Sequence, residues 1–217
     1  FVPPGTMLPL DQAIEMAFKA CGAFDYAFRQ GIIHRDVKPA NLLLDRLGHV
    51  HVLDFGIMRL GGDHGDSSLG TRSGVLLGTV SFMPPEQALG RSEEIDARTD
   101  VWAVGATMFS LITGKLVHRA RSMNEALVLA ATQQAPPIRQ SDPSVPKPLA
   151  AVIDRALAFD KTDRFADAST MRRALRRAVG LEPDAATEGA DATASAVMTL
   201  PEESLTDVDR PARAVAG

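Results

Sequence analysis

An acid, a cation and two groups able to bind a metal ion lie close together in the chain, at Asp36, Lys38, Asn41 and Asp54. The amide oxygen of Asn41 and the carboxylate of Asp54 are the hard oxygen ligands that magnesium prefers. Asp54 follows Asn41 by thirteen residues, a separation that fits a two-stranded hairpin. Transfer of a γ-phosphoryl group needs little covalent chemistry from a protein, which mainly aligns the nucleophile and neutralises phosphate charge. The four residues therefore indicate a phosphoryl-transfer site.

The stretches around these residues resemble two motifs of the eukaryotic-like protein kinases. Residues 34–41 read His-Arg-Asp-Val-Lys-Pro-Ala-Asn, like the catalytic loop, and residues 54–56 read Asp-Phe-Gly, like the magnesium loop. Any one of these residues alone could be a solvated loop charge, but unrelated loops do not assemble this order and spacing. The lysine at position 38 resembles the serine/threonine branch of the family.

The resemblance implies a role for each residue of the site. Asp36 would accept the proton of the substrate hydroxyl, and Lys38 would contact the γ-phosphate of ATP. Asn41 and Asp54 would hold Mg²⁺ and, through it, the nucleotide phosphates. Leu43 stands where the family packs an aliphatic side chain beneath adenine, although plain core is an equally compatible interpretation. ATP and Mg²⁺ are therefore the expected cofactors.

Further motifs occur at the intervals that are typical of the family. Residues 78–87 resemble the end of an activation segment, with Pro-Pro-Glu in place of the usual Ala-Pro-Glu, and residues 100–105 resemble the start of the long central helix. The resemblance implies a buried ion pair between Glu86 and Arg164, and an Asp100 that accepts hydrogen bonds from the catalytic loop backbone. The motif residues with an expected structural role are His34, Phe55, Gly56, Glu86, Asp100 and Arg164.

The region between the two motif groups predicts a regulatory loop. Residues 61–74 are rich in glycine and serine, which predicts mobility and is equally compatible with a plain connector. Two features favour a switch: Thr71 and Ser73 are candidate phosphosites, and Arg35 could pair with a phosphate there. Thr79 differs from them, because the family uses this threonine to contact the catalytic aspartate and lysine.

Composition divides the chain into two parts. With 217 residues and 45% hydrophobic content it can bury one sizeable core. Residues 181–217 carry eight acids and two arginines and lack aromatic residues, so we expect a disordered linker or tail. Residues 1–180, the expected kinase lobe, carry 19 acids and 21 bases. A nearly neutral lobe gives no support for nucleic-acid binding.

No signal peptide is apparent, and no apolar run reaches the ~20 residues that a membrane-spanning helix needs. A cytoplasmic location is therefore expected, and an anchor outside these residues stays open. Cys21, the single cysteine, lies on the apolar side of a helical pattern and is interpreted as a buried structural thiol.

Local patterns predict a mainly α fold with one short hairpin at the site, a kinase-like large lobe that would become α+β in a complete domain. A helix should begin at residue 10, carry an apolar stripe that includes Phe24 and Phe28, and stop at Gly31. The central helix is apolar almost all round, which predicts burial. Strands are expected at 42–44 and 50–53, and further helices at 101–113, 123–133, 148–159 and 167–179.

The features of a kinase small lobe do not precede His34: a glycine-rich phosphate loop, a strand lysine and a helix glutamate are absent there, and residues 1–5 resemble the hinge between lobes. We therefore expect a C-terminal lobe fragment that meets its small lobe elsewhere. Two functions remain open. The first is a serine/threonine kinase that transfers the γ-phosphate of ATP to hydroxyls of protein substrates. The alternative is a catalytically silent, pseudokinase-like lobe that serves as a scaffold or binding module.

Overall fold

The computed structural model describes residues 7–45, 47–54, 80–181 and 196–198. Five residues singled out from the sequence lie outside this part: Phe55, Gly56, Thr71, Ser73 and Thr79. The described part is mainly helical, with a short hairpin near residues 34–41. This agrees with the sequence-based expectation of a mainly α fold with one hairpin at the site.

The first helix, α1 (Leu10–Arg29), ends where the sequence predicts, because Gly31 adopts a left-handed φ of 75° that glycine tolerates without strain. Phe24 is buried, as expected, but Phe28 is 43% exposed, so its assignment to the buried stripe was wrong. Ala27, three positions after Phe24, is buried instead: positions three and four residues on share one helix face, and the packing around the last turn decides which of them is covered. Cys21 is fully buried, and this burial raises the pKa of its thiol to about 12.

The central helix, α4 (Ala97–Thr113), is buried along its length except at Arg98, which confirms the prediction of a buried helix. It begins four residues earlier than expected, because Asp96 and Thr99 form a capping box that satisfies the first backbone N–H groups. Gly105 allows α7 to approach closely: a Cβ atom there would lie 2.9 Å from the Cβ of Ala156.

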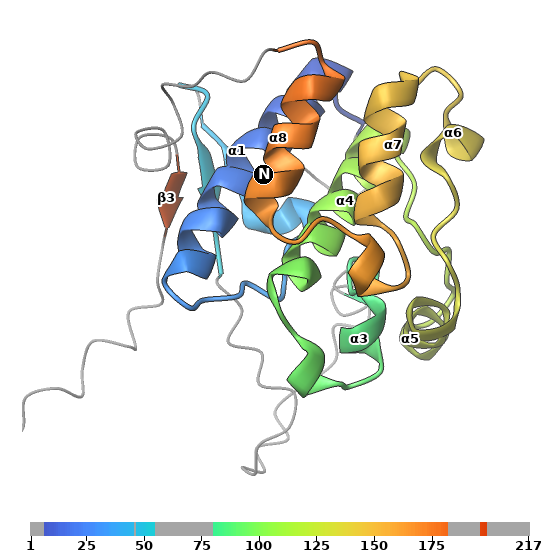
Figure 1. Cartoon of the computed structure of the whole chain (residues 1–217). Coiled ribbons are helices and arrows are strands. Elements are labelled where there is room, and N and C mark those ends of the chain that lie inside the picture. Colours follow the sequence, from blue (N-terminus) through green and yellow to red (C-terminus); the bar gives the residue numbers. More distant parts are fainter. Residues whose placement is uncertain (1–6, 46, 55–79, 182–195, 199–217) are drawn as a thin grey trace, which may run out of the picture.

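Three helices pack around α4, as Figure 1 shows: α1, α7 (Lys147–Ala156) and α8 (Ala168–Ala178). They share one hydrophobic core, which includes Trp102, Phe109, Ile153 and Met171. A second, smaller cluster joins α3 (Pro85–Ala88) to α5 (Met123–Thr132), below the main bundle in the same view. The remaining short elements are η1 (Pro39–Asn41), η2 (Ser92–Glu94), α6 (Ile138–Ser141) and η3 (Lys161–Asp163).

The hairpin at the site is formed by β1 (Leu42–Leu44) and β2 (Val50–Val52), which pair antiparallel with Leu43 opposite His51. A third strand, β3 (Ala196–Met198), lies parallel to β2 and next to α1. The sequence predicted no strand in residues 181–217. Residues 196–198 show no alternating pattern in the sequence. Their backbone pairs with the edge of β2, which lies about 145 residues earlier in the chain.

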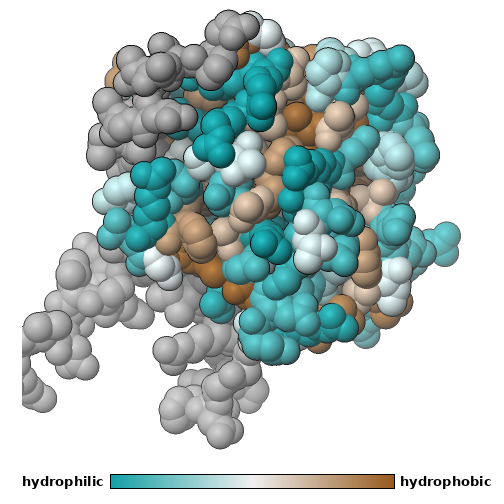
Figure 2. All heavy atoms as spheres, viewed as in Figure 1, coloured by the Kyte–Doolittle hydropathy of each residue, from teal (hydrophilic) through white to brown (hydrophobic). Residues whose placement is uncertain are grey.

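Hydrophilic residues cover much of the face drawn in Figure 2, with hydrophobic residues between them. Large exposed hydrophobic side chains in the described part include Met7, Leu47 and Val128, which are far apart in the sequence. Among the described residues, no helix combines the length and the apolar character needed to cross a membrane.

Candidate active site

Lys38 and Asn41 both contact the carboxylate of Asp36 in the loop between α1 and β1. The Nζ atom of Lys38 lies 2.8 Å from Asp36 Oδ2. Asn41 donates through Nδ2 to the same Oδ2 at 3.0 Å and to the backbone oxygen of Asp36 at 2.8 Å. The side chains of Asp36 and Lys38 are each about one-sixth exposed, at 16% and 17%. The carboxylate is therefore fixed by two donors and still reachable from solvent.

The hairpin returns the chain to this loop at Asp54. Leu42 pairs with Val52, and the backbone N–H of Leu53 donates to the oxygen of Asn41 at 2.8 Å. Asp54 follows directly and is exposed, with a left-handed φ of 49°. The short hairpin thus brings the start of the magnesium-loop motif beside the end of the catalytic-loop motif.

Asn41 and Asp54 offer a pair of oxygen ligands suited to magnesium. Because Asn41 uses Nδ2 for both of its hydrogen bonds to Asp36, its Oδ1 atom is the one left to face a cation. The exposed carboxylate of Asp54 supplies a second hard oxygen. Within the described ranges, no group of three or more histidine, cysteine, aspartate and glutamate side chains could hold a metal ion. A pair of protein oxygens, one from Asn41 and one from Asp54, fits an ion that takes its remaining ligands from water and phosphate, as magnesium does.

Asp100, at the start of α4, holds the beginning of the catalytic loop. Its carboxylate accepts the backbone N–H of His34 at Oδ2 and of Arg35 at Oδ1, both at 2.9 Å. The side chain is buried, and burial raises its pKa to about 6, against the lowering effect of the two N–H donors. The charge thus sits in an unfavourable environment that these two hydrogen bonds partly offset.

His34 lies fully buried between α1 and the hairpin. Its Nε2 atom is 3.1 Å from the backbone oxygen of Leu53, and its ring meets Phe24 edge-on with centroids 5.5 Å apart. Burial lowers the pKa of His34, so the neutral imidazole is favoured at neutral pH. The histidine therefore joins α1, the catalytic loop and the residue before Asp54 into one unit.

Arg35 has a strained backbone. Its φ of 66° is left-handed, which costs a residue other than glycine about 1–3 kcal/mol and persists only where the surroundings hold it. Asp100 holds its N–H, and Gln87 of α3 holds its carbonyl through a hydrogen bond from Nε2 at 3.0 Å. No role for Gln87 was predicted from the sequence. Its position beside Glu86 in the Pro-Pro-Glu motif was the only available signal.

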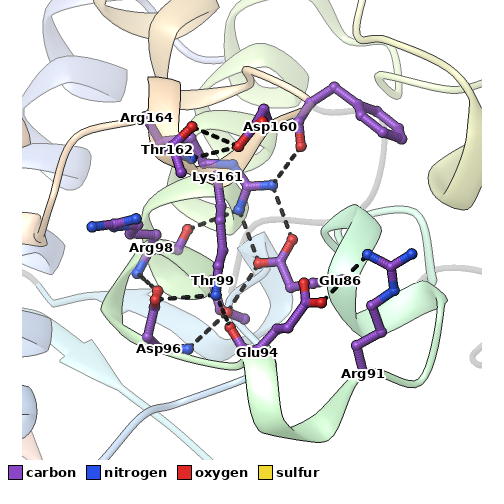
Figure 3. A network of polar contacts seen from close by, with 11 residues as sticks. Glu86, Arg91, Glu94, Asp96, Arg98, Thr99, Asp160, Lys161, Thr162 and Arg164 are labelled. Atoms are coloured by element: carbon purple, nitrogen blue, oxygen red, sulfur yellow. Dashed lines mark hydrogen bonds and ion pairs between the residues drawn. The ribbon is translucent and has the colours of Figure 1, made fainter.

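Glu86 and Arg164 form a bidentate ion pair, with both guanidinium-to-carboxylate distances at 2.9 Å (Figure 3). The pair is deeply buried, with 4% of the Glu86 side chain and none of the Arg164 side chain exposed. Thr99 also donates to Glu86, from Oγ1 at 3.0 Å. The guanidinium donates further to the backbone oxygens of Ala158, Arg98 and Phe159, at 2.8, 3.2 and 3.1 Å. Both charges are thus well satisfied.

Figure 3 also shows residues of this network that sequence reasoning missed. Lys161 donates to the backbone oxygen of Glu94 at 2.5 Å and lies 3.3 Å from Asp96. Asp160 precedes η3 as its N-cap and accepts the backbone N–H of Thr162. Asp96 was recognisable in principle, because it stands three residues before Thr99 and could be interpreted as a helix cap. The long-range partners carried no such local signal.

Leu43, the expected adenine neighbour, is half-buried in β1 two residues after Asn41. Of the remaining expected residues, Thr79, Thr71 and Ser73 lie outside the described part. The structure thus brings together Asp36, Lys38 and Asn41, places Asp54 beside them, and pairs Glu86 with Arg164 and Asp100 with the loop backbone.

Comparison with known proteins identifies a family for the chain. The protein kinase domain family matches residues 4–176. The chain is 36% identical over 196 residues to the serine/threonine-protein kinase PknB of Mycolicibacterium smegmatis, covering 88% of this chain and 30% of that protein. It is 36% identical over 179 residues to the serine/threonine-protein kinase Pkn1 of Myxococcus xanthus, covering 81% of this chain and 25% of that protein. With PknB of Mycobacterium tuberculosis, identity is 32% over 220 residues, covering 95% and 34%.

The chain therefore spans about a third or less of the length of these curated relatives. The family match covers most of the chain and includes both loops of the site as well as the Glu86–Arg164 pair. The chain belongs to the protein kinase domain family, and it is similar to bacterial members of the serine/threonine type.

Proposed function

We propose that this chain is the large lobe of a protein serine/threonine kinase, which transfers the γ-phosphate of ATP to hydroxyl groups of protein substrates. The observation that carries this proposal is the convergence of Lys38 and Asn41 on the Asp36 carboxylate, beside Asp54. A silent lobe would have no need to hold an acid, a cation and two oxygen ligands in this arrangement. The boundaries of the lobe, residues 1–180, and of the tail, residues 181–217, belong to the same proposal.

Each residue of the site would have its own role in the reaction. Asp36 accepts the proton of a serine or threonine hydroxyl, whose oxygen then bonds to the γ-phosphorus while the bond from that phosphorus to the β-γ bridging oxygen breaks. Lys38, 2.8 Å from Asp36, contacts the phosphoryl group in transfer. ADP is the leaving product. Leu43 would lie beneath the adenine.

Asn41 and Asp54 would hold Mg²⁺, which supplies Lewis-acid stabilisation of phosphate charge when bound. The bond from Asn41 Nδ2 to Asp36 would fix the amide so that Oδ1 points away from the carboxylate. The acid that receives the proton and the amide that faces the metal would thus be oriented by the same contact. Thr79, by resemblance, would contact Asp36 and Lys38.

A transfer assay tests this function. The hybrid kinase for this purpose joins the small lobe of the Mycolicibacterium smegmatis relative ahead of residue 1, because residues 1–5 resemble the hinge. Incubated with labelled ATP, Mg²⁺ and peptides that differ only in carrying serine, threonine or tyrosine, it should label the serine and threonine peptides. Absence of label from all three, while the hybrid kinase is folded by circular dichroism, would favour the scaffold alternative. Label on tyrosine alone would overturn the serine/threonine assignment.

We further propose that Thr71 and Ser73 are regulatory phosphosites and that Arg35 pairs with their phosphates. A phosphate held by arginine would favour an ordered activation segment. After autophosphorylation of the hybrid kinase, mass spectrometry should find phosphate on at least one of the two residues. The variant with both replaced by alanine should be slower but still active, because Asp36, Lys38 and Asn41 are untouched. Equal rates for this variant and the unaltered enzyme would exclude regulation through these residues.

A further inference from the structure

The peptide group that joins Arg35 to Asp36 is held at both of its ends. On one side, the carbonyl of Arg35 accepts the hydrogen bond from Gln87 Nε2 at 3.0 Å. On the other side, the N–H of Asp36 lies 3.3 Å from Nδ1 of His34. This peptide plane determines the direction in which the Asp36 side chain leaves the backbone. Its orientation is therefore part of the placement of the carboxylate that Lys38 and Asn41 contact.

The plane needs such contacts because Arg35 is left-handed. Relaxation of its φ from 66° towards the usual negative range would rotate the adjoining peptide groups. Asp100 restrains the preceding peptide group, through the N–H of Arg35. Among the contacts of the described residues, the one to the carbonyl of Arg35 comes from Gln87. Asp100 and Gln87 thus restrain opposite sides of the same strained residue, from α4 and from α3.

The orientation of the Gln87 amide is fixed by this contact, because only its nitrogen can donate to a carbonyl. Its Oε1 atom then lies buried without a hydrogen-bond partner among the described residues. Gln87 as a whole is only 6% exposed. A buried acceptor without a partner lowers stability. The side chain is therefore better suited to holding the Arg35 carbonyl than to stabilising the fold.

Glu86, the preceding residue, anchors α3 through the buried pair with Arg164. Gln87 extends from the same short helix towards the catalytic loop. The ion pair thus holds α3 in the position from which Gln87 contacts the catalytic loop.

We propose that Gln87 is a positioning residue for phosphoryl transfer: its Nε2 holds the Arg35–Asp36 peptide and thereby the direction of the Asp36 carboxylate. This rests on the proposed kinase function. Loss of the contact leaves the site residues present but frees the peptide plane, so the turnover rate falls while ATP binding, which depends on other groups, is unchanged.

The test uses two replacements at position 87 and one control. Gln87→Met keeps the length of the side chain and removes both the donor and the unpaired acceptor. Gln87→Glu keeps the shape and places a carboxylate against the carbonyl, so it can donate only when protonated. Gln12→Met is the matched control, because Gln12 is exposed on α1.

In the 217-residue chain, amide hydrogen exchange at Arg35 and Asp36 should be faster in Gln87→Met than in the Gln12→Met control. In the hybrid kinase, Gln87→Met should lower kcat about 10-fold, as expected for one lost positioning hydrogen bond. Its KM for ATP should stay within about twofold. Its melting temperature should change little, because removal of the unpaired Oε1 offsets the loss of the donor to the Arg35 carbonyl. The rate of Gln87→Glu relative to the unaltered enzyme should rise as the pH is lowered, because protonation restores a donor.

These readouts separate a failure of the proposal from a failure of the kinase function. The exchange experiment needs no activity, so unchanged exchange in Gln87→Met would overturn the positioning role even if the hybrid kinase were silent. Faster exchange with an unchanged kcat would also overturn it. A parallel fall in kcat and melting temperature, with no pH dependence in Gln87→Glu, would reduce Gln87 to a purely structural residue.

Discussion

The catalytic loop, residues 34–41, and the Glu86–Arg164 pair are both built from charged side chains, but their surroundings differ. The carboxylate of Asp36 and the ammonium of Lys38 are partly exposed, and the residue before Asp36 has a strained backbone. The Glu86–Arg164 pair is buried and bidentate, Thr99 donates a further hydrogen bond to Glu86, and Arg164 donates to backbone oxygens. The backbone of the loop is held by side chains from α3 and α4, whereas the two charges of the pair bind each other directly.

On the proposed function, this contrast assigns stability and chemistry to separate residues that lie close together. Adjacent positions in α3 illustrate it, because Glu86 contacts Arg164 and Gln87 contacts the catalytic loop. Replacements in the two regions should therefore have effects of different kinds.

Asp54→Ala should give a large loss of activity with little loss of stability. The side chain is exposed at the end of the hairpin, so its removal leaves no cavity. Loss of a metal ligand should lower the transfer rate of the hybrid kinase by a factor on the order of 10³, which corresponds to several kcal/mol of charge stabilisation. The rate should be measured against Mg²⁺ concentration, with Asp11→Ala on α1 as an exposed control. A normal rate at ordinary Mg²⁺ concentration would mean that Asp54 is not a metal ligand.

Glu86→Ala should have the reverse effect and lower stability by about 3–5 kcal/mol, because it leaves the guanidinium of Arg164 buried without its partner. Urea unfolding of the 217-residue chain measures this loss. Glu94→Ala is the matched control: its pair with Arg91 is exposed at 3.4 Å, and its removal should change stability by less than about 1 kcal/mol. Equal losses in the two variants would show that burial of the Glu86 pair does not matter.

Asp100 should give a smaller effect that depends on pH. Its folded-state pKa of about 6 lies above the ordinary value, so folding favours the protonated form. The corresponding stability is fully present below the ordinary carboxyl pKa and is lost as the pH rises through about 6. The unfolding free energy of the unaltered chain, minus that of Asp100→Asn, should therefore decrease between about pH 4 and pH 7. A difference that increases over this range would show that the two N–H donors outweigh burial.

Much of the fold and site was predictable from the sequence because the signals are local. The stop of α1 at Gly31, the buried helix α4 and the hairpin between Asn41 and Asp54 follow from spacing and turn residues. Helices α5, α7 and α8 begin and end within three residues of their predicted bounds.

What the sequence did not show depends on contacts between distant parts of the chain. The bond from Gln87 to Arg35 joins residues 52 positions apart, and neither residue type by itself indicates the other. The exposure of Phe28 depends on which neighbouring helix covers the last turn of α1, and β3 depends on a distant strand edge. The left-handed φ of Arg35 also has no sequence signal, because glycine and asparagine are the residues that usually adopt it.

On the proposed function, the Asp36 carboxylate serves the chemistry of phosphoryl transfer and not the stability of the lobe. The most direct test compares Asp36→Asn with the unaltered hybrid kinase in two measurements on the same preparation: single-turnover phosphate transfer and urea unfolding. We expect a loss of transfer of about 10²–10⁴-fold, typical of a removed general base, with the unfolding free energy changed by less than about 1 kcal/mol. Transfer at the unaltered rate, or a loss of transfer matched by unfolding, would contradict it.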